Sequence, residues 1–454
     1  MGNEVEYPLE PIPVKFIETK NRRICTQIPV PESISILKQL QEVEPRSMRG
    51  QPLVVWDHAE GVNIYDKWGN KWLDLSSGVL VANAGHSRKE IINAIIEQAE
   101  HGLIHNYVFP SEIRLKCIKK ILEFCPTYFK KVFLLTTGSE TTECALKLTR
   151  TWGHLKGGKS KNVFITFENS FHGRTLGAQM MGGIPKLKEW IINHDPEIIQ
   201  VPFPDGFYNE NTSFDLFEET LSKNGIFPEN VCGVMTETYQ GGGADFLPKD
   251  YAQKLRKWCN EAEALLIFDE IQAGFGRTGK KFGYMHYDVE PDLICVGKGI
   301  SSGLPLSAII GKPEIMDLYP PGSMTSTHTG NPICCASVIA NIEVIEKEKL
   351  VENAEKVGIV MHKRLKEIVE RYSIAGVCHG KGLVAGLQIV KPKTKIPDLD
   401  KALLICKNLV ENGIMVFSPV GKSTVKICPP LCITEEQILE AMDVLENVVK
   451  YWSK

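Results

Sequence analysis

The 454-residue sequence contains no apolar run close to the roughly 18–20 residues that a membrane-spanning helix needs. It also lacks a strongly basic stripe. Its 52 Lys and Arg against 55 Asp and Glu give a net charge of −3, which argues against nucleic acid as the main partner. The acidic, proline-containing residues 1–13 lack the apolar stretch of a secretory signal. We therefore expect a cytoplasmic protein that binds neither membranes nor nucleic acids.

Two common site patterns are also missing. The 13 cysteines are scattered, and neither Cys334-Cys335 nor Cys428 with Cys432 has a second His or Cys pair at zinc-ligand spacing. Free thiols in a reducing cytosol account for them, and we expect no metal site. No Gly-x-Gly-x-x-Gly segment follows the first strand, which excludes a Rossmann-type nucleotide binder.

Short β-rich apolar runs alternate with helical periods through most of the chain. The composition, 43% hydrophobic and 24% charged, fits a globular enzyme of about two or three domains. Strands separated by helices favour a mainly parallel sheet with right-handed crossovers. The predicted strands are residues 132–136, 163–167, 231–235, 264–268, 293–296 and 306–310, and the predicted helices are 139–151 and 249–262.

The sequence pattern changes from about Pro332. Long amphipathic helices and short strands follow, which predict a smaller α+β domain. A turn at residues 66–70 separates two short strand patterns within residues 56–74. The predicted helices of the C-terminal part are residues 335–348, 351–372 and 434–449, and the predicted strands are 382–390 and 413–417.

Three groups of chemically useful residues lie where predicted strands end. Thr136-Thr-Gly-Ser139 opens a helix, whose backbone N–H groups and nearby hydroxyls suit a phosphate. Asp269 would point into the crevice where α/β sheets bind ligands. Lys298 has a glycine on each side. Taken singly, each group also fits a plain role, as a helix cap, a capping acid or a surface-loop lysine.

Taken together, the three groups fit the chemistry of pyridoxal 5'-phosphate. This cofactor needs a lysine for its aldehyde, an acid at its pyridinium nitrogen and a phosphate site. The acid keeps the nitrogen protonated, so that the ring can absorb the electrons left when a Cα proton departs. The free amine of Lys298 can then move that proton between carbons.

Six segments spread along the chain share the pattern of one enzyme family. They are Leu73-Asp-Leu-Ser-Ser-Gly78 with Gly85-His86, and residues 137–143, 171–175, 268–279, 297–307 and 327–332. From about Gly50 onwards the chain resembles the class III aminotransferases, the ω-amino acid, 4-aminobutyrate and acetylornithine type of pyridoxal-phosphate enzyme. The resemblance implies an α/β structure of fold type I. A large domain, residues 76–332, would hold a mainly parallel seven-stranded sheet, and residues 1–75 and 333–454 would form a smaller α+β domain.

The resemblance implies the roles of the residues nearest the chemistry. Lys298 would form the Schiff base with the cofactor, and Asp269 would pair with the pyridine nitrogen. Gly138 and Ser139 would hold the phosphate.

Other matching positions imply contacts around the cofactor. Phe171 would stack on one face of the ring, and His172 would lie at the edge of the site. Gln272 would lie near the 3-hydroxyl, and Glu237 would be buried beneath the cofactor in a supporting role. Thr327 would reach the cofactor phosphate of the neighbouring subunit. This last contact implies a homodimer and leaves a tetramer open.

The substrate side departs from the family pattern. Arg174 matches the position that holds the distal carboxylate in 4-aminobutyrate aminotransferases, and its guanidinium suits an anion. The arginine that binds the α-carboxylate of glutamate in many relatives is Lys426 here, and its glutamate partner is Gly242. Lysine keeps the charge but lacks the bidentate fork, which favours pyruvate over 2-oxoglutarate as the amino acceptor.

The expected function is transfer of an amino group from an ω-amino acid or a related anionic amine to a 2-oxo acid. Two alternatives stay open. Residues 304–311 and 330–334 resemble the isoleucine 2-epimerase type of racemase, and ammonia-eliminating lyases of phospho- or phosphono-amines share the scaffold. All three reactions would use Lys298 and Asp269. A non-catalytic scaffold protein would be expected to lose one of these two residues, and both are present.

Overall fold

The computed structural model describes residues 6–454, so the first five residues of the expected N-terminal segment lie outside the described residues. By packing, the chain forms two compact units. The first consists of residues up to Arg88, residues 242–244 and residues 353–454, and the second of residues 89–241 and 245–352. The expected division after residues 75 and 332 stays a prediction, whereas the packing units change after Arg88 and Glu352.

The second unit is built on a seven-stranded sheet of order β6-β14-β13-β12-β9-β7-β8. Strand β14 is antiparallel to both neighbours, and the other four pairs are parallel, which confirms the expected fold class. The strands are β6 (Lys131–Leu135), β7 (Val163–Phe167), β8 (Ile198–Val201), β9 (Val231–Glu237), β12 (Leu265–Asp269), β13 (Leu293–Val296) and β14 (Ser307–Gly311). The sequence predicted all of them except β8, a four-residue strand at the sheet edge.

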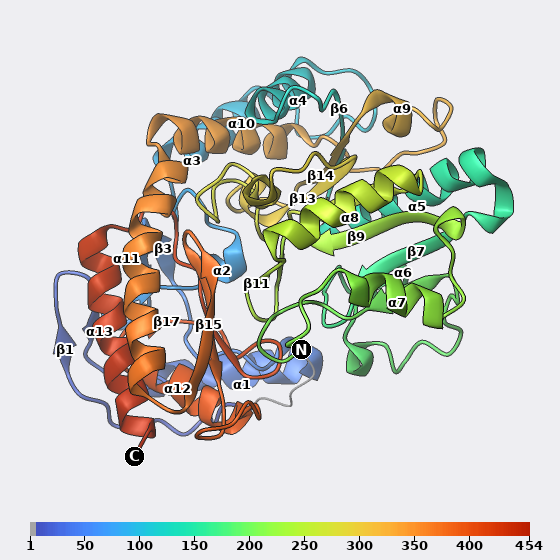
Figure 1. The fold of residues 1–454 in the computed structure, drawn as a ribbon. Helices are drawn as coiled ribbons and strands as arrows, with labels where there is room; N and C mark the ends of the chain where they lie inside the picture. The colour runs from blue at the N-terminus through green and yellow to red at the C-terminus, as the bar shows by residue number, and fades with distance from the viewer. Residues whose placement is uncertain (1–5) are drawn as a thin grey trace. The chain divides into compact units, whose positions relative to one another are not determined.

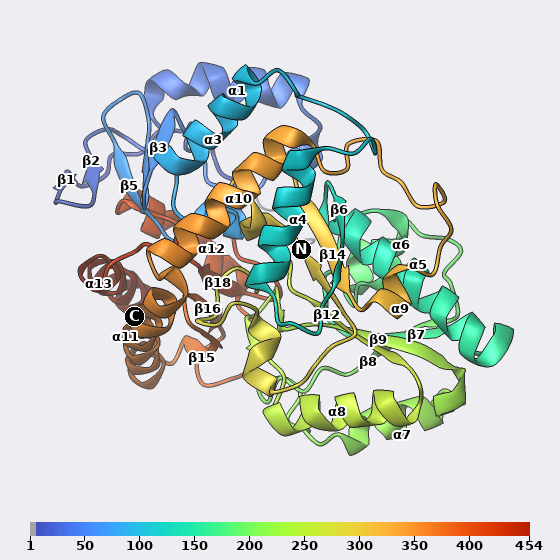
Figure 2. The same cartoon turned by 90° about the horizontal axis from the view of Figure 1, so that it is seen from above.

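Helices cover both faces of this sheet. In Figure 2, α7 and α8 lie on one side of the strands and α5 lies on the other. The larger helices of the unit are α3 (Lys89–Glu100), α4 (Glu112–Phe124), α5 (Gly138–Gly157), α7 (Asp215–Lys223), α8 (Lys249–Glu261) and α10 (Pro332–Lys347). Because both faces are covered, the central strands β9, β12 and β13 are buried along their whole length.

Two glycines allow α5 to lie close to β9. A Cβ atom on Gly153 of α5 would come within 2.3 Å of the Lys161 carbonyl oxygen and 2.4 Å of the Cys232 Cβ. A Cβ atom on Gly233 of β9 would come within 2.4 Å of the Thr149 Cγ2. Contacts this short leave no room for a side chain, so the two glycines fix how α5 lies on the sheet.

The first unit combines segments from the N-terminal and C-terminal parts of the chain. Its larger sheet has the order β1-β2-β5-β4-β3, and β17 pairs in parallel with β5. Its smaller sheet is antiparallel, with the order β15-β16-β18. Figure 1 shows the long helices α11 and α13 beside these strands. The Trp72 indole Nε1 donates to the Val410 carbonyl oxygen at 2.9 Å and ties the two segments together.

The elements of the first unit are short apart from its helices. The strands are β1 (Ile17–Glu18), β2 (Arg23–Ile24), β3 (His58–Glu60), β4 (Asn63–Tyr65), β5 (Lys71–Asp74), β15 (Ala375–Lys381), β16 (Val384–Ile389), β17 (Ile414–Met415) and β18 (Thr424–Ile427). The helices are α1 (Ile34–Val43), the short α2 (Ser77–Leu80), α11 (Leu350–Arg371), α12 (Leu399–Glu411) and α13 (Glu435–Trp452). The sequence prediction did not include β1, β2, α1, α12, β15 or β18.

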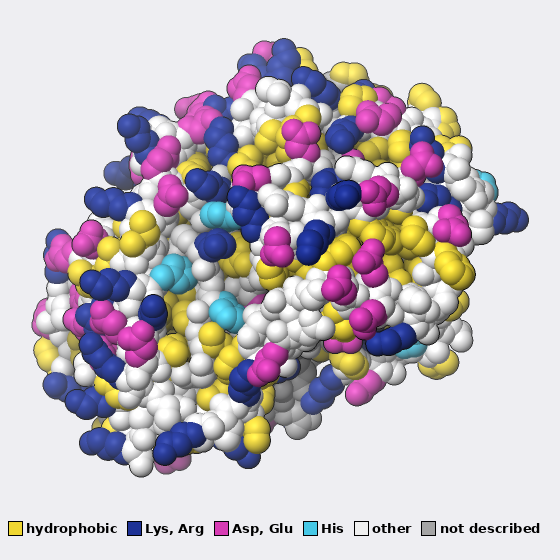
Figure 3. All heavy atoms as spheres, in the orientation of Figure 1, with side chains coloured by type: hydrophobic (Ala, Val, Ile, Leu, Met, Phe, Trp, Pro, Cys, Tyr) yellow, Lys and Arg dark blue, Asp and Glu magenta, His cyan; other side chains and the backbone are white. Residues whose placement is uncertain are grey.

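Within residues 6–454, no helix combines the length and the apolar character that crossing a membrane requires. On the face drawn in Figure 3, basic and acidic side chains are intermingled, and neither sign covers a broad area. The 13 cysteines, all of them in the described part of the chain, are free.

Candidate active site

Nearly all of the predicted site residues line one cavity of about 200 Å³ in the second unit. The exceptions are Arg174, Thr327 and Lys426. The lining residues are Gly138, Ser139, Phe171, His172, Gly173, Glu237, Tyr239, Asp269, Ile271, Gln272, Ala273 and Lys298. They come from segments distant in sequence because β6, β9, β12 and β13 run in the same direction, so that their carboxyl ends meet at one edge of the sheet.

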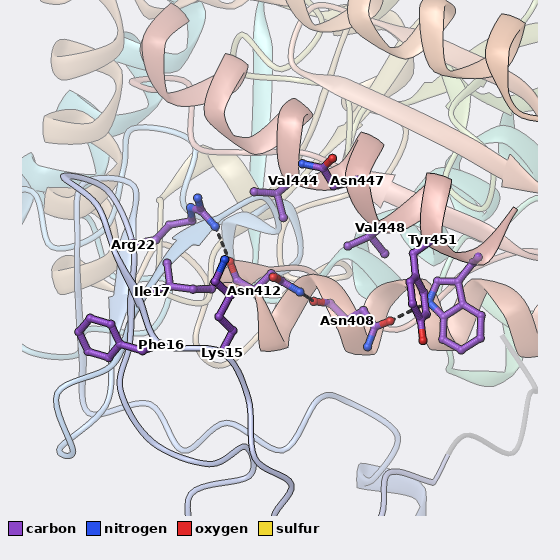
Figure 4. Close-up of a pocket in the computed structure, with 11 residues that line it drawn as sticks. Lys15, Phe16, Ile17, Arg22, Asn408, Asn412, Val444, Asn447, Val448 and Tyr451 are labelled. Carbon is purple, nitrogen blue, oxygen red and sulfur yellow. Dashed lines mark hydrogen bonds between the residues drawn. The ribbon is translucent and has the colours of Figure 1, made fainter. Parts of the chain in front are cut away.

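A larger cavity, of about 660 Å³, lies in the first unit beside α12 and α13 (Figure 4). Several of its polar groups bind one another. Arg22 donates to the Asn412 carbonyl oxygen at 2.6 Å, and the Trp452 indole donates to Asn408 Oδ1 at 2.7 Å. Its lining contains no acid, histidine or cysteine. The smaller cavity of the second unit therefore carries the chemistry.

Asp269, at the end of β12, is held by two partners. Its Oδ2 lies 2.8 Å from the His172 Nδ1, and its Oδ1 accepts a hydrogen bond from the Ile271 backbone N–H at 3.1 Å. Burial lowers the pKa of His172, but its hydrogen bond to Asp269 and the charges of Asp269 and Glu237 outweigh burial and raise that pKa overall. A protonated His172 stabilises the negative charge of Asp269. The second ring nitrogen of His172 is buried and has no hydrogen-bond partner among the described residues.

Lys298 follows β13 in a conformation that is unusual for a residue with a side chain. Its φ angle is 45°, in the left-handed region, and it opens a short 3-10 turn, Lys298–Ile300. Burial lowers the pKa of its amine, and the negative charges of Asp269 and Glu237 only partly oppose that shift. A lower pKa leaves more of the amine neutral, which is the form that attacks a carbonyl carbon.

The N-terminus of α5 forms one wall of the cavity. Thr137 and Glu140 close it in a capping box, so the backbone at Gly138 and Ser139 is firmly placed. A Cβ atom on Gly138 would lie 2.9 Å from the Ile271 Cδ1, and one on Gly173 would lie 2.3 Å from the Ser139 Oγ. The glycines thus keep a backbone cradle narrow at a helix N-terminus, where anions bind well.

Glu237, at the end of β9, supports the loop that carries Phe171. Its Oε2 accepts from the Phe171 backbone N–H at 3.0 Å and its Oε1 from the Gly241 backbone N–H at 2.9 Å. Burial raises the pKa of Glu237 to about 7, with a contribution from the charge of Asp269.

Four lining residues were not among the predicted site residues, namely Gly173, Tyr239, Ile271 and Ala273. Ile271 lies two positions after Asp269, and together with Phe171 it gives the cavity an apolar surface that suits a flat ring. The hydroxyl of Tyr239 donates to the Gln272 carbonyl oxygen at 3.0 Å. Ile271 lies in the turn that follows β12, within the 268–279 segment that carries the family resemblance. No sequence signal pointed to Tyr239.

A family model described as class III aminotransferase matches residues 46–449. The chain belongs to this family. It is 32% identical to the acetylornithine/succinyldiaminopimelate aminotransferase of Photorhabdus laumondii, over 86% of this chain and 92% of that one. It is also 32% identical to the isoleucine 2-epimerase of Lentilactobacillus buchneri, over 87% and 89% of the two chains.

Solved structures agree with this assignment. An amine transaminase from an uncultivated Pseudomonas species, solved with bound pyridoxal phosphate, has a TM-score of 0.83 and 26% identity, over 90% of this chain and 97% of that chain. Class III aminotransferases depend on pyridoxal 5'-phosphate. The cavity suits this cofactor because it joins a narrow helix N-terminus, a buried acid paired with histidine and a lysine of lowered pKa.

The three predicted site residues that do not line the cavity differ in position. Arg174 is exposed, and its guanidinium carbon lies 5.7 Å from the centre of the Phe171 ring. Thr327 is exposed in the second unit, on the segment before α10. Lys426 belongs to β18 of the first unit and is buried. In the same unit, a Cβ atom on Gly242 would lie 3.1 Å from the Gly421 Cα.

We predict that Glu237→Gln reduces the pH dependence of stability in the cofactor-free protein. The pKa of Glu237 is about 7 in the folded state against an ordinary 4.5. Between these values the folded state binds more protons than the unfolded state, so the free energy of unfolding falls as the pH rises. Glutamine has no proton to lose, so the fall becomes shallower.

The measurement is urea unfolding at pH 5 and pH 7.5. Part of the slope remains in the variant because burial also raises the pKa of Glu270 to about 7. The exposed Glu261→Gln serves as the control and should keep the wild-type slope. Equal slopes for Glu237→Gln and the wild type would show that Glu237 is already ionised in the fold.

Proposed function

We propose that this class III aminotransferase transfers the amino group of an ω-amino acid or a related anionic amine to a 2-oxo acid. The observation that supports it most is the meeting of Lys298 with the paired Asp269 and His172 at one cavity. When bound, pyridoxal phosphate supplies the electron sink for the bonds at the amine-bearing carbon. The residues of the chain hold and move the protons.

In this proposal Lys298 and Asp269 are the catalytic residues. The Lys298 Nζ removes the proton from the amine-bearing carbon and returns it to complete the transfer, a role that its lowered pKa favours. The Asp269 carboxylate holds a proton on the pyridine nitrogen, and His172 keeps the carboxylate charged through the 2.8 Å contact. Gly138 and Ser139 bind the phosphate at the start of α5.

Phe171, Gln272 and Glu237 complete the proposed cofactor site. Phe171 faces the ring, and Gln272 lies near its 3-hydroxyl. Glu237 holds the Phe171 backbone in place through the hydrogen bond of 3.0 Å. Each of these side chains lines the same cavity, which is the support for assigning them to one ligand.

A second candidate is an amino-acid racemase or epimerase. It is favoured by the 32% identity to isoleucine 2-epimerase, which equals the identity to the acetylornithine/succinyldiaminopimelate aminotransferase. Both reactions begin with removal of the same proton by Lys298. They differ in the carbon to which the proton returns, so the residues at the cavity do not separate them.

The reaction class is tested by incubating the enzyme with a panel of amines in deuterated water, with and without pyruvate or 2-oxoglutarate. We expect a new amino acid only when a 2-oxo acid is present, with pyruvate the better acceptor. Deuterium uptake with loss of optical activity and no acceptor would instead show a racemase. Release of free ammonia would show a lyase. Lys298→Ala is the control that should abolish all three outcomes.

We propose that Arg174 binds the anionic end of the amine, and that Lys426 is a second substrate-binding cation. The position of Arg174 supports its role. The guanidinium lies beside Phe171, and the Arg174 backbone N–H donates to the Ser139 Oγ at 3.2 Å. For Lys426 the support is the family match alone.

We expect Arg174→Ala to raise KM for 4-aminobutyrate by about 10-fold to 100-fold, the size of a lost charge-assisted hydrogen bond. KM for a neutral amine such as butylamine should change little. Arg174→Lys keeps the positive charge but cannot donate two parallel hydrogen bonds, so its KM for 4-aminobutyrate should lie between those of the wild type and Arg174→Ala. Arg371→Ala, an exposed arginine of the first unit, is the control. Equal changes for both amines would mean that Arg174 is structural.

We also propose that the enzyme is a homodimer in which Thr327 binds the cofactor phosphate of the partner subunit. Exposed apolar side chains are frequent on α3, on α4 and on the segment between them, and exposed apolar surface is typical of an interface. They include Ile92, Ile96, Ile104, Phe109 and Leu115. The Tyr107 hydroxyl donates to the Thr325 Oγ1 at 3.1 Å, so these side chains adjoin the segment that carries Thr327.

Mixed dimers test this proposal. Lys298→Ala and Thr327→Ala chains are co-expressed with different tags, and the mixed dimer is purified. If Thr327 acts across the interface, the one site with Lys298 receives Thr327 from the partner and binds pyridoxal phosphate with wild-type affinity. If Thr327 acts within its own chain, that site stays as weak as in the Thr327→Ala homodimer. A wild-type protein that purifies as a monomer would contradict the proposed homodimer.

We propose a cytoplasmic location for the enzyme. The support is the set of 13 free cysteines in the described chain, which suits a reducing compartment.

A further inference from the structure

The turn that carries Lys298 is bound by a buried side chain of α10. The Asn341 Nδ2 donates to the Gly299 carbonyl oxygen at 2.9 Å and to the Ile300 carbonyl oxygen at 2.8 Å. Its Oδ1 accepts from the Ser302 hydroxyl at 2.6 Å. Asn341 is fully buried, and both ends of its amide are engaged by one short segment of backbone and side chain. The two carbonyl partners fix which end of the amide is the nitrogen.

A second residue of α10 extends this contact. Ser337 lies four positions before Asn341, on the same face of the helix. Its hydroxyl donates to the Ser301 carbonyl oxygen at 2.9 Å. The carbonyl groups of three consecutive residues, 299 to 301, therefore accept hydrogen bonds from one helix face.

The turn needs such support because its own backbone is strained. Lys298 and Ser302 have φ angles of 45° and 51°, and neither is a glycine. Two backbone hydrogen bonds hold the turn, from the Ile300 N–H to the Gly297 carbonyl at 3.1 Å and from the Ser301 N–H to the Lys298 carbonyl at 3.4 Å, and the Ser301 hydroxyl donates to the Leu304 carbonyl oxygen. Strained conformations of this kind persist only where surrounding contacts over-determine them.

We propose that Asn341 and Ser337 are positioning residues that hold the backbone of Lys298 in its left-handed conformation and so aim its amine into the cavity. The inference rests on the proposed function, because it explains how Lys298 is placed for that reaction. Neither residue lines the cavity, and each acts through the turn. We call the hydrogen bonds from Asn341 and Ser337 to this turn the clamp. If the clamp is lost, the turn relaxes and the Lys298 amine moves. A displacement of about 1 Å can slow a reaction about 100-fold.

The first test uses the cofactor-free protein, so it does not depend on activity. Hydrogen exchange is followed in a peptide that covers residues 298–304. We expect Asn341→Leu, of similar volume but without the amide, to speed exchange in this peptide at least about tenfold. Ser337→Ala and Ser302→Ala should give smaller increases. Ile342→Ala is the control, because Ile342 is buried in the same helix but lies on another face.

The second test uses the enzyme loaded with pyridoxal phosphate. The pH at which the visible absorbance band changes reports the environment of the Lys298 nitrogen. Asn341→Leu should shift that pH and lower kcat about 10-fold to 100-fold with little change in KM, and Ile342→Ala should do neither.

The proposed role of Asn341 would be overturned if residues 298–304 exchange at the same rate in Asn341→Leu and in the Ile342→Ala control. It would also be overturned if the absorbance transition of Asn341→Leu is not shifted. If Asn341→Leu does not fold, Ser337→Ala and Ser302→Ala decide the question by the same two readouts. A wild-type protein that takes up no pyridoxal phosphate would overturn the proposed function, while the exchange experiment would still decide whether α10 holds the turn.

Discussion

The site depends on a carboxylate that must stay charged where little water reaches it. Burying an unpaired charge is expensive, so Asp269 at the end of β12 requires His172, which lies 2.8 Å away. A second acid, Glu237, lies close enough for the charge of Asp269 to raise its pKa. The two acids have different hydrogen-bond partners. Asp269 pairs with the imidazole of His172, and Glu237 accepts hydrogen bonds from the backbone N–H groups of Phe171 and Gly241. This division places Phe171 and His172, neighbours in sequence, at the same cavity.

The fold brings the remaining parts to that carboxylate by strand direction and close packing. Gly153 and Gly233 let α5 approach β9, and the N-terminus of α5 follows the end of β6 at the same sheet edge as Asp269. Lys298 arrives at the end of β13 in a strained turn. The strain is tolerable because Asn341 of α10 supplies hydrogen bonds that the turn cannot make within itself. The sheet thus sets where each group lies, and α10 sets how the lysine is aimed.

Sequence predicted the central sheet well because continuous apolar runs such as 264–268 are unmistakable, and it predicted the cavity because strand ends meet at one edge. Helix α12 was overlooked although its buried residues 402, 405, 406 and 409 follow a helical period. Strand β15, rich in glycine and only partly buried, offers no alternation to detect. The clamp was beyond prediction, since no spacing rule links Asn341 to carbonyl groups about 40 residues earlier.

Gly242, one of the two departures from the family pattern on the substrate side, lies close to the backbone of Gly421. A Cβ atom on Gly242 would lie 3.1 Å from the Gly421 Cα, and one on Gly421 would lie 2.7 Å from the Gly242 carbonyl oxygen. The two backbones meet where the family pattern has a glutamate side chain, so a side chain at position 242 would require the backbone at Gly421 to shift by a few tenths of an ångström. Recovering an arginine–glutamate pair would take two substitutions, because Lys426 and Gly242 occupy both positions. In our proposal, selection for an anionic amine falls to Arg174, whose guanidinium carbon lies 5.7 Å from the centre of the Phe171 ring. Glu237 fixes the Phe171 backbone, and the Phe171 ring packs against Arg174, which we propose binds the anionic end of the substrate. The same Glu237 lies close enough to Asp269 for the charge of Asp269 to raise its pKa.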